Sequence, residues 1–322
     1  MKMIAATTRV DAHGMMHTKE SLESMVRQCN QGESAIRMGI EHDMSVPPLG
    51  KCVDAELVEI DGGHAVVLDQ RQWNVRAKVR LPDGSVAVVE SLSDDARPLK
   101  ANDRGSDEHD FTVAFDPVNL GGFEDFTQIH CPQFIQMGIH PEQFFRKSTI
   151  PDPEIVITAI KSVVAYLGLR TLGKAIGKEI AEKVSRDVGV WYDKIKLMAA
   201  HYVSQMKPSN KPITYILVVP GEPKLEIVVQ GPSLEKLAEV MSLEYLEKVA
   251  SLADHVNLSI PLVSIQYLDR GDGPKLNYML TRDGKVISEE GAIARRNARV
   301  MAMNAIPRGN AACKKRRTQR AV

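Results

Sequence analysis

Two proline-containing breaks constrain the fold of this chain more than any other feature of its sequence. They are Pro151-Asp152-Pro153 and the run Lys207–Pro212. Proline fixes φ, lacks a backbone N–H and restricts the residue before it, so a regular helix does not continue through such a run. The apolar pattern also changes at each break, from strand-like to helical and back. We therefore expect a multidomain α+β protein divided into residues 1–150, 151–207, 208–290 and a basic, disordered tail at 291–322.

The first part, residues 1–150, has the pattern of a β-rich domain. A helix is expected after Thr18, a capping residue that precedes apolar residues at helical spacing. The turn residues Asp61-Gly62-Gly63 predict a β-hairpin. The expected strands and hairpin arms are Met3–Val10, Cys52–Ile60, His64–Leu68, Val75–Leu81, Val86–Val89 and Phe111–Phe115.

The other two parts differ from the first in their periodicity. From Glu154 to about Met206, apolar residues recur at steps of three and four, which predicts helices that are interrupted at glycines. After Pro212 the order of patterns is ββαββ, with one helical region, which indicates a small α+β domain. Its expected elements are strands Ile213–Val219 and Leu225–Val229, a helical region Ser233–Leu252, and strands Leu262–Leu268, Leu276–Thr281 and Lys285–Ile287.

Composition excludes several classes of protein. The 41 Lys and Arg residues balance 41 Asp and Glu residues, which argues against a generally basic nucleic-acid coat. With 43% hydrophobic residues the chain is globular over most of its length. Aromatic residues make up only 5%, too few for a surface that stacks single-stranded bases.

The four cysteines and the termini favour a cytoplasmic protein. The cysteines Cys29, Cys52, Cys131 and Cys313 are far apart and form no CxxC pair, so neither a disulfide framework nor a structural zinc site is expected. The N-terminus is too short in its apolar part to be a signal peptide, and no apolar run reaches the length of a transmembrane helix. No cofactor is expected, because Gly173–Lys178 lacks the spacing of a phosphate-binding loop.

The segment from Ile40 to Val53 carries the strongest signal for chemistry. Here His42 lies between two acids, a proline pair follows at Pro47-Pro48, and Gly50 opens a new strand. Taken alone, this is a histidine in a turn. Asp43 is expected to be a solvent-exposed or capping acid, because adjacent strand residues point to opposite faces. A metal cluster of His42 with His13, His17 and His64 is not expected, since no ligand spacing is matched.

Four segments in order resemble the phage prohead proteases, which are capsid-maturation serine proteases with the fold of herpesvirus assemblin. They are Asp11–Leu22 as the opening strand and helix, Glu41-His42-Asp43 as the catalytic-histidine motif, Pro48–Val53 as the following strand, and Glu59–Val66 as a hairpin. The resemblance covers about the first 70 residues. It implies a β-barrel-like N-terminal domain and peptidase activity.

The resemblance also implies where a nucleophile would stand. The family's serine strand matches Phe111–Phe115, with Thr112 in place of serine and Ala114 in place of glycine. His42 would then accept the proton of the Thr112 hydroxyl and later protonate the leaving amine. The β-branched threonine crowds that attack, and the family's glutamate motif is not recognisable. The third catalytic group stays open among Glu90, His109, His130 and His140, and Ser91 and Ser93 are alternative nucleophiles.

Two functions compete at this point. One is a peptidase that cleaves a partner protein or itself. The other is an inactive, protease-like binding or assembly module that would dock a partner protein or a membrane through its helical segment. The chain could also form a homo-oligomer. The apolar run Ile155–Leu169 could contact a membrane surface or pack as a buried helix. The basic run Lys314–Arg317 could bind an anionic partner or only solubilise the tail.

Overall fold

The structure is a computed structural model of the whole chain. It describes residues 2–10, 16–40, 43–81, 84–100, 112–143, 154–158, 161–171, 178–206, 212–231, 234–257 and 260–305.

The described strands form two sheets, and the fold is mixed α+β, as expected. A four-stranded antiparallel sheet has the order β1-β4-β3-β2, and a larger sheet has the order β5-β6-β14-β13-β12-β11-β10-β9-β7-β8. The strands of the smaller sheet are β1 (Lys2–Thr7), β2 (Ile36–Met38), β3 (Gly50–Ile60) and β4 (Gly63–Gln72). The strands of the larger sheet are β5 (Val75–Arg80), β6 (Val86–Ser91), β7 (Thr112–Phe115), β8 (His140–Gln143), β9 (Glu154–Thr158), β10 (Thr214–Val219), β11 (Lys224–Gln230), β12 (Leu262–Asp269), β13 (Pro274–Thr281) and β14 (Val286–Glu289).

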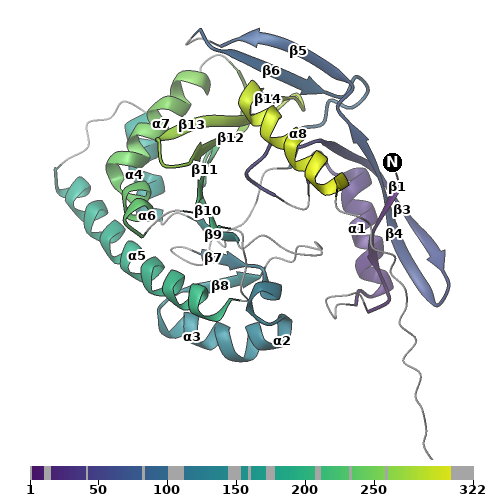
Figure 1. Cartoon of the computed structure of the whole chain (residues 1–322), viewed down its shortest axis with the longest axis horizontal. Helices are drawn as coiled ribbons and strands as arrows, with labels where there is room; N and C mark the ends of the chain where they lie inside the picture. The colour runs from purple at the N-terminus through teal and green to yellow at the C-terminus, as the bar shows by residue number, and fades with distance from the viewer. Residues whose placement is uncertain are drawn as a thin grey trace, which may run out of the picture.

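The helices lie around the larger sheet in two groups. Figure 1 shows α4 to α7 on one side of that sheet and α8 on the other, with α1 beside the smaller sheet. The long helices are α1 (Lys19–Gln31), α4 (Lys161–Thr171), α5 (Lys178–Gln205), α6 (Leu234–Met241), α7 (Leu243–Asn257) and α8 (Glu290–Ala305). Short helical turns follow β7, namely η1 (Pro117–Leu120), α2 (Phe123–Asp125), the π-helical η2 (Phe126–His130) and α3 (Cys131–Gln136).

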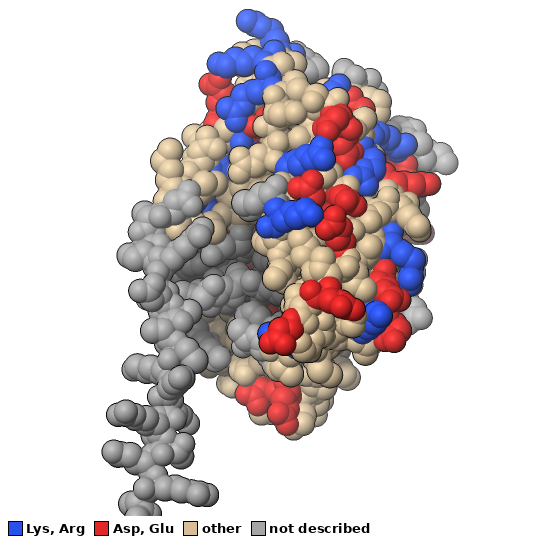
Figure 2. All heavy atoms as spheres, turned by 90° about the vertical axis from the view of Figure 1, so that its right-hand side faces the viewer, with Lys and Arg blue, Asp and Glu red and all other residues tan. Residues whose placement is uncertain are grey.

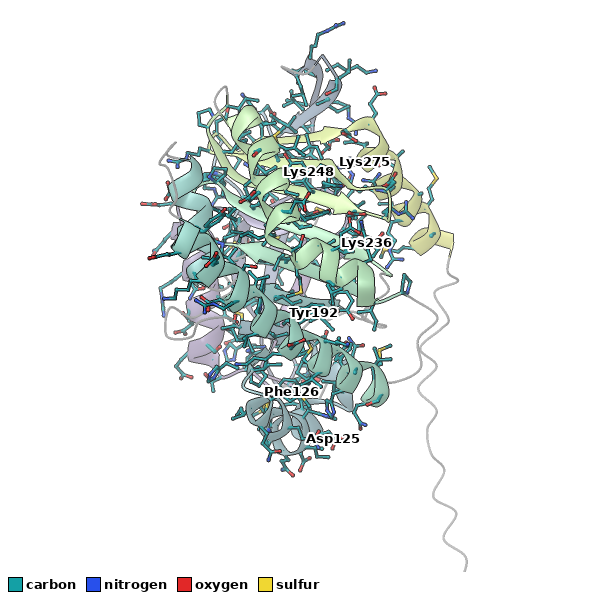
Figure 3. All side chains as sticks on the ribbon, turned by 90° about the vertical axis from the view of Figure 1, so that its left-hand side faces the viewer. Asp125, Phe126, Tyr192, Lys236, Lys248 and Lys275 are labelled. Atoms are coloured by element: carbon teal, nitrogen blue, oxygen red, sulfur yellow. The ribbon has the colours of Figure 1, made fainter. Side chains whose placement is uncertain are left out.

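The main core lies between the larger sheet and the layer of helices. Alternate residues of β10 divide between the two faces: Tyr215 and Leu217 contact the helices, and Ile216 and Val218 point the other way. Trp191 of α5 and Leu246 of α7 fill the helix side of this core. The helices lie in front of the sheet in Figure 3, where Tyr192 of α5 and Lys248 of α7 are labelled.

The local elements of the first 100 residues follow their sequence signals. The hydroxyl of Thr18 accepts a hydrogen bond from the backbone N–H of Ser21, as an N-cap does. Gly62, at φ 76°, turns β3 into β4. The expected second hairpin is β5–β6, and Leu22 and Cys29 of α1 pack on β3 and β4. Strands β1 to β4 form an open sheet whose edge strands are β1 and β2.

The chain differs from expectation directly after Pro153. Residues Glu154–Thr158, expected to begin a helix, form strand β9, which is buried throughout and parallel to β10. A short, fully apolar run fits a buried strand and a buried helix equally well, so periodicity alone does not separate them. In the run Ile155–Leu169, Ile157 and Val163 are almost fully buried and belong to the main core. None of the described helices is long and apolar enough to cross a membrane.

The C-terminal segment also differs, because residues 291–305, expected to belong to a disordered tail, form helix α8 together with Glu290. Three of its residues, Ala292, Ile293 and Arg296, are buried at helical spacing. A basic composition suggested a solvated tail, but one arginine of this helix faces the protein interior. The run Lys314–Arg317 lies outside the described residues.

The larger sheet crosses the expected boundaries of the parts. Strands β5 to β8 come from residues 1–150, β9 comes from 151–207, and β10 to β14 come from 208–290. Hairpin β5–β6 joins through β6 to β14, and β7 joins through β9 to β10. The larger sheet therefore unites strands far apart in the sequence.

Candidate functional site

The segment that follows His42 lies on the face of the larger sheet away from helices α4 to α7. We call this the second face; its apolar centre consists of Ala114, Val156, Ile216, Val218, Val228 and Leu268. Met44 packs against this apolar centre. His42 itself, like Glu41 and His109, lies outside the described residues. The structure thus brings the residues next to His42 to the sheet face that also bears Ala114.

Asp43 caps the turn of this segment. Its carboxylate accepts hydrogen bonds from the backbone N–H of Ser45 at 2.8 Å and from the Ser45 hydroxyl at 2.6 Å. The guanidinium of Arg299 in α8 lies 3.6 Å from the same carboxylate. Asp43 therefore shapes the turn, in agreement with the capping role expected from the sequence.

The rest of the segment is held by distant side chains. Asn277 of β13 donates a hydrogen bond to the carbonyl of Ser45 at 2.8 Å. Arg296 and Trp73 both donate to the carbonyl of Pro48, at 2.7 Å and 2.9 Å. Residues 43–49 are thus fixed to the larger sheet and to α8 at several points.

Thr112 lies in β7, between β9 and β8, and its side chain is 2% exposed. Its hydroxyl donates a hydrogen bond to the hydroxyl of Thr158 at 3.3 Å. Because Val113 points to the helix side, Thr112 and Ala114 point to the second face. Within the described part of the chain, no carboxylate or imidazole forms a hydrogen bond with Thr112, and another hydroxyl is not a base at neutral pH.

The other candidate catalytic residues lie in separate elements. Glu90 of β6 is buried and accepts hydrogen bonds from Arg296 at 2.6 Å and from Arg76 at 2.5 Å. Burial opposes ionisation of Glu90, but the two guanidiniums outweigh it and lower the pKa of the carboxyl. Glu90 is therefore the anion of an ion-pair cluster. Ser93 is hydrogen-bonded to Asn74 at the end of the β5–β6 hairpin.

The two described candidate histidines lie on the helix side or at the sheet edge. His130 of η2 is 3.3 Å from His201 of α5, nitrogen to nitrogen, and burial lowers the pKa of both rings. His140 lies in edge strand β8. Two imidazoles are too few for a zinc site. Among the described residues, no group of three or more His, Cys, Asp or Glu side chains could hold a metal ion.

A buried polar network crosses the second face beside the 43–49 segment. Gln266 of β12 donates to Glu226 at 2.7 Å and to the hydroxyl of Tyr278 at 3.0 Å. Arg37 donates to the same hydroxyl at 2.9 Å, and Asn277 donates to the side-chain oxygen of Gln266 at 2.7 Å. Burial raises the pKa of Tyr278, so its phenol stays protonated.

Sequence reasoning missed this network because its five members come from four strands, β2, β11, β12 and β13. One signal was present: Glu226, Gln266 and Asn277 interrupt otherwise apolar strand patterns. A polar residue inside a buried strand needs a hydrogen-bond partner, so such interruptions indicate polar contacts between strands.

A surface groove lies at the other end of the larger sheet, with a volume of about 1010 Å³. Its floor is formed by residues of β5, β6 and β14, and its far wall by residues that follow α7 and β13. Its apolar lining includes Val75, Ala77, Val79, Val89 and Ile287, and its charged lining residues are Arg80, Arg282, Lys285 and Asp283.

Comparisons with protein-family models, with curated proteins and with solved structures give no match to this chain.

Proposed function

We propose that this protein is a binding module that holds an extended, acidic segment of a partner protein along strand β5. The observation that carries the proposal is the apolar groove over β5, β6 and β14. The Thr112 side chain is buried in β7, bonds to the Thr158 hydroxyl and does not line this groove. We also propose that the protein acts in the cytoplasm, as its widely separated cysteines led us to expect.

The groove presents apolar side chains in the order that an added strand needs. Val75, Ala77 and Val79 are alternate residues of β5, and all three line the groove. Val89 of β6 and Ile287 of β14 continue this surface inward. Alternate apolar side chains of a bound extended segment would pack on such a surface.

Strand β5 is the edge of the larger sheet in the described part of the chain. Leu81 donates its backbone N–H to Ser85 at 2.8 Å, and the register pairs Val79 with Ala87 and Ala77 with Val89. In an antiparallel pair, hydrogen-bonded residues alternate with residues whose backbone groups point outward. The free edge groups are therefore those of the even-numbered residues of β5: Arg76, Lys78 and Arg80.

The charge of β5 selects the partner. The strand contains three basic residues and no acidic one, and Figure 2 shows Lys and Arg side chains gathered at this end of the molecule. Glu90 and Glu290 pair with Arg76 and Lys78, whereas Arg80 forms no ion pair with the described residues. A second copy of β5 would place like charges opposite one another, which is unfavourable. An acidic strand is the complementary occupant.

The test is fluorescence anisotropy with a labelled extended peptide that alternates valine and glutamate. We expect it to bind, and a valine–lysine peptide of equal length not to bind. Lys78→Pro removes one edge N–H, worth about 1 kcal/mol, and weakens binding about fivefold relative to the matched Lys78→Thr variant. Equal binding of both peptides, or equal affinities of the two variants, would contradict the proposal.

A peptidase resembling the prohead proteases is the second candidate function. The specific observation in its favour is that Met44, two residues after His42, packs against the cluster that contains Ala114, two residues after Thr112. In this proposal His42 and Thr112 form the acid–base and nucleophile pair. Incubation of the purified chain, alone and with proteins co-expressed with it, should then show cleavage that His42→Ala and Thr112→Val both abolish. If the unmodified chain leaves itself and these proteins intact, the peptidase proposal is refuted.

A further inference from the structure

A cavity of about 610 Å³ lies between the β12–β13 turn and helix α8, apart from the groove. Leu268 and Leu276 form the apolar part of its wall. The charged residues around it are Arg270, Lys275, Arg295, Asp272 and Glu289. Three cations thus face two carboxylates, which leaves a net charge of +1.

The cationic groups around the cavity differ in how far they are already paired. Lys275 forms an ion pair with Asp272. Arg270 is exposed and forms no hydrogen bond or ion pair with the described residues. Arg295 donates one hydrogen bond, from Nη2 to the side-chain oxygen of Asn277 at 2.7 Å, and its buried Nε has no acceptor. Two guanidiniums therefore retain unused donors at one cavity.

The positive charges of Arg270 and Arg295 lie at the same cavity, which favours the binding of an anion there. Burial, and then the positive charge of Arg270, lower the pKa of Arg295, and the carboxylate of Glu289 offsets this only in part. A guanidinium remains protonated in proteins, so this lowering expresses an unfavourable environment for the charge. An anion between the two arginines would relieve it.

The backbone of the turn that carries Arg270 and the side chain of Arg295 are both held before any ligand arrives. Arg270 belongs to a turn fixed by the buried Asp269, which accepts hydrogen bonds from the backbone N–H of Gly271 at 2.7 Å and from the Tyr245 hydroxyl at 2.7 Å. Arg295 is fixed by Asn277, which also bonds to Ser45 and Gln266. Arg295 therefore binds an anion with little further ordering cost, whereas the exposed side chain of Arg270 becomes ordered on binding.

We propose that this cavity binds a phosphate group, with Arg270 and Arg295 as its ligands. A guanidinium presents a planar pair of N–H donors that matches phosphate oxygens, and two such groups serve its several terminal oxygens. The volume lies in the range of small-molecule sites. The phosphate is free or belongs to a small organic molecule, whose remaining part would rest on Leu268 and Leu276.

The test is thermal unfolding of the full chain in inorganic phosphate, glycerol 3-phosphate or AMP, at constant ionic strength set with chloride. We expect saturating phosphate to raise Tm by about 2 °C. Arg270→Gln and Arg295→Lys should abolish the shift. The control is Arg186→Gln, an exposed residue of α5 on the helix side, which should keep it.

The three ligands separate the two sources of phosphate. A shift at much lower concentrations of AMP or glycerol 3-phosphate than of inorganic phosphate would identify a phosphorylated small molecule. Equal effects of all three would identify free phosphate. A shift of the same size in Arg270→Gln and Arg186→Gln, or no shift with any of the three, would overturn the proposal. This test does not involve the β5 groove, so the phosphate site and the peptide-binding function can fail independently.

Discussion

At the scale of the residue, Gly50 shows how close two strands approach in the smaller sheet. A β-carbon on Gly50 would lie 1.9 Å from the carbonyl oxygen of Arg71 and 2.8 Å from the α-carbon of Gln72. Both contacts are with the backbone of β4, so no side-chain rotation could relieve them. Gly50 thereby allows β3 to begin directly after the anchored segment 43–49.

We predict that Gly50→Ala lowers the free energy of unfolding by about 1–3 kcal/mol, the usual cost of inserting a methyl group into filled space. The matched control is Gly189→Ala in α5, where an added β-carbon meets nothing within 4 Å. That change should stabilise the helix by up to about 1 kcal/mol. Urea denaturation of both variants measures the difference, and similar free energies would contradict the prediction.

At the scale of the element, helix α8 is attached to the larger sheet by a buried ion pair. The side chains of Arg296 and Glu90 are 3% and 2% exposed and 2.6 Å apart. Two hydrogen bonds run from Arg296 to this carboxylate, and a third goes to Pro48. The same arginine thus joins α8, β6 and the segment after His42.

We predict that Arg296→Ala destabilises the fold by about 3–5 kcal/mol, because it leaves the buried carboxylate of Glu90 without its main partner. Arg299→Ala in the same helix removes a longer, more exposed pair with Asp43 and should cost no more than about 1 kcal/mol. Chemical denaturation would show this contrast. The double variant Glu90→Leu/Arg296→Met should recover much of the loss, and its failure to do so would point to the Pro48 hydrogen bond instead.

At the scale of the whole molecule, the larger sheet makes the parts of the chain depend on one another. Strand β10 pairs with β9 on one side, and β14 pairs with β6 on the other. A fragment of residues 208–290 would lose both neighbours and expose two strand edges. It would also lose the core contacts of Trp191 and Ile195 from α5.

We therefore predict that the isolated 208–290 fragment does not fold as a monomer, although its sequence resembles a complete small domain. Circular dichroism and proton NMR of the fragment would show little tertiary structure, while the full chain would unfold cooperatively. A dispersed spectrum and a sharp thermal transition of the fragment alone would contradict this expectation.

Much of the local structure could be read from the sequence, because its causes are local. The Thr18 cap, the Asp61-Gly62-Gly63 turn and the alternating arms of the hairpins each place their signal within a few neighbouring residues. The same holds for strands β10 to β13 and the helices between them. The sequence also pointed to residues 40–53 as an unusual segment, and Asp43 caps a turn there.

Only the tertiary structure decided how distant residues meet. The residues of β9 are apolar and show neither a helical nor a strand period, so only their pairing with β10 identifies them as a strand. Arg296 looked like part of a solvated tail, and its burial follows from Glu90, 206 positions away in the sequence. The donors at the β12–β13 cavity and the free edge of β5 likewise depend on which strands become neighbours. Local propensity fixes the elements, whereas pairing over long separations in the chain is set by burial and hydrogen bonding in the folded state.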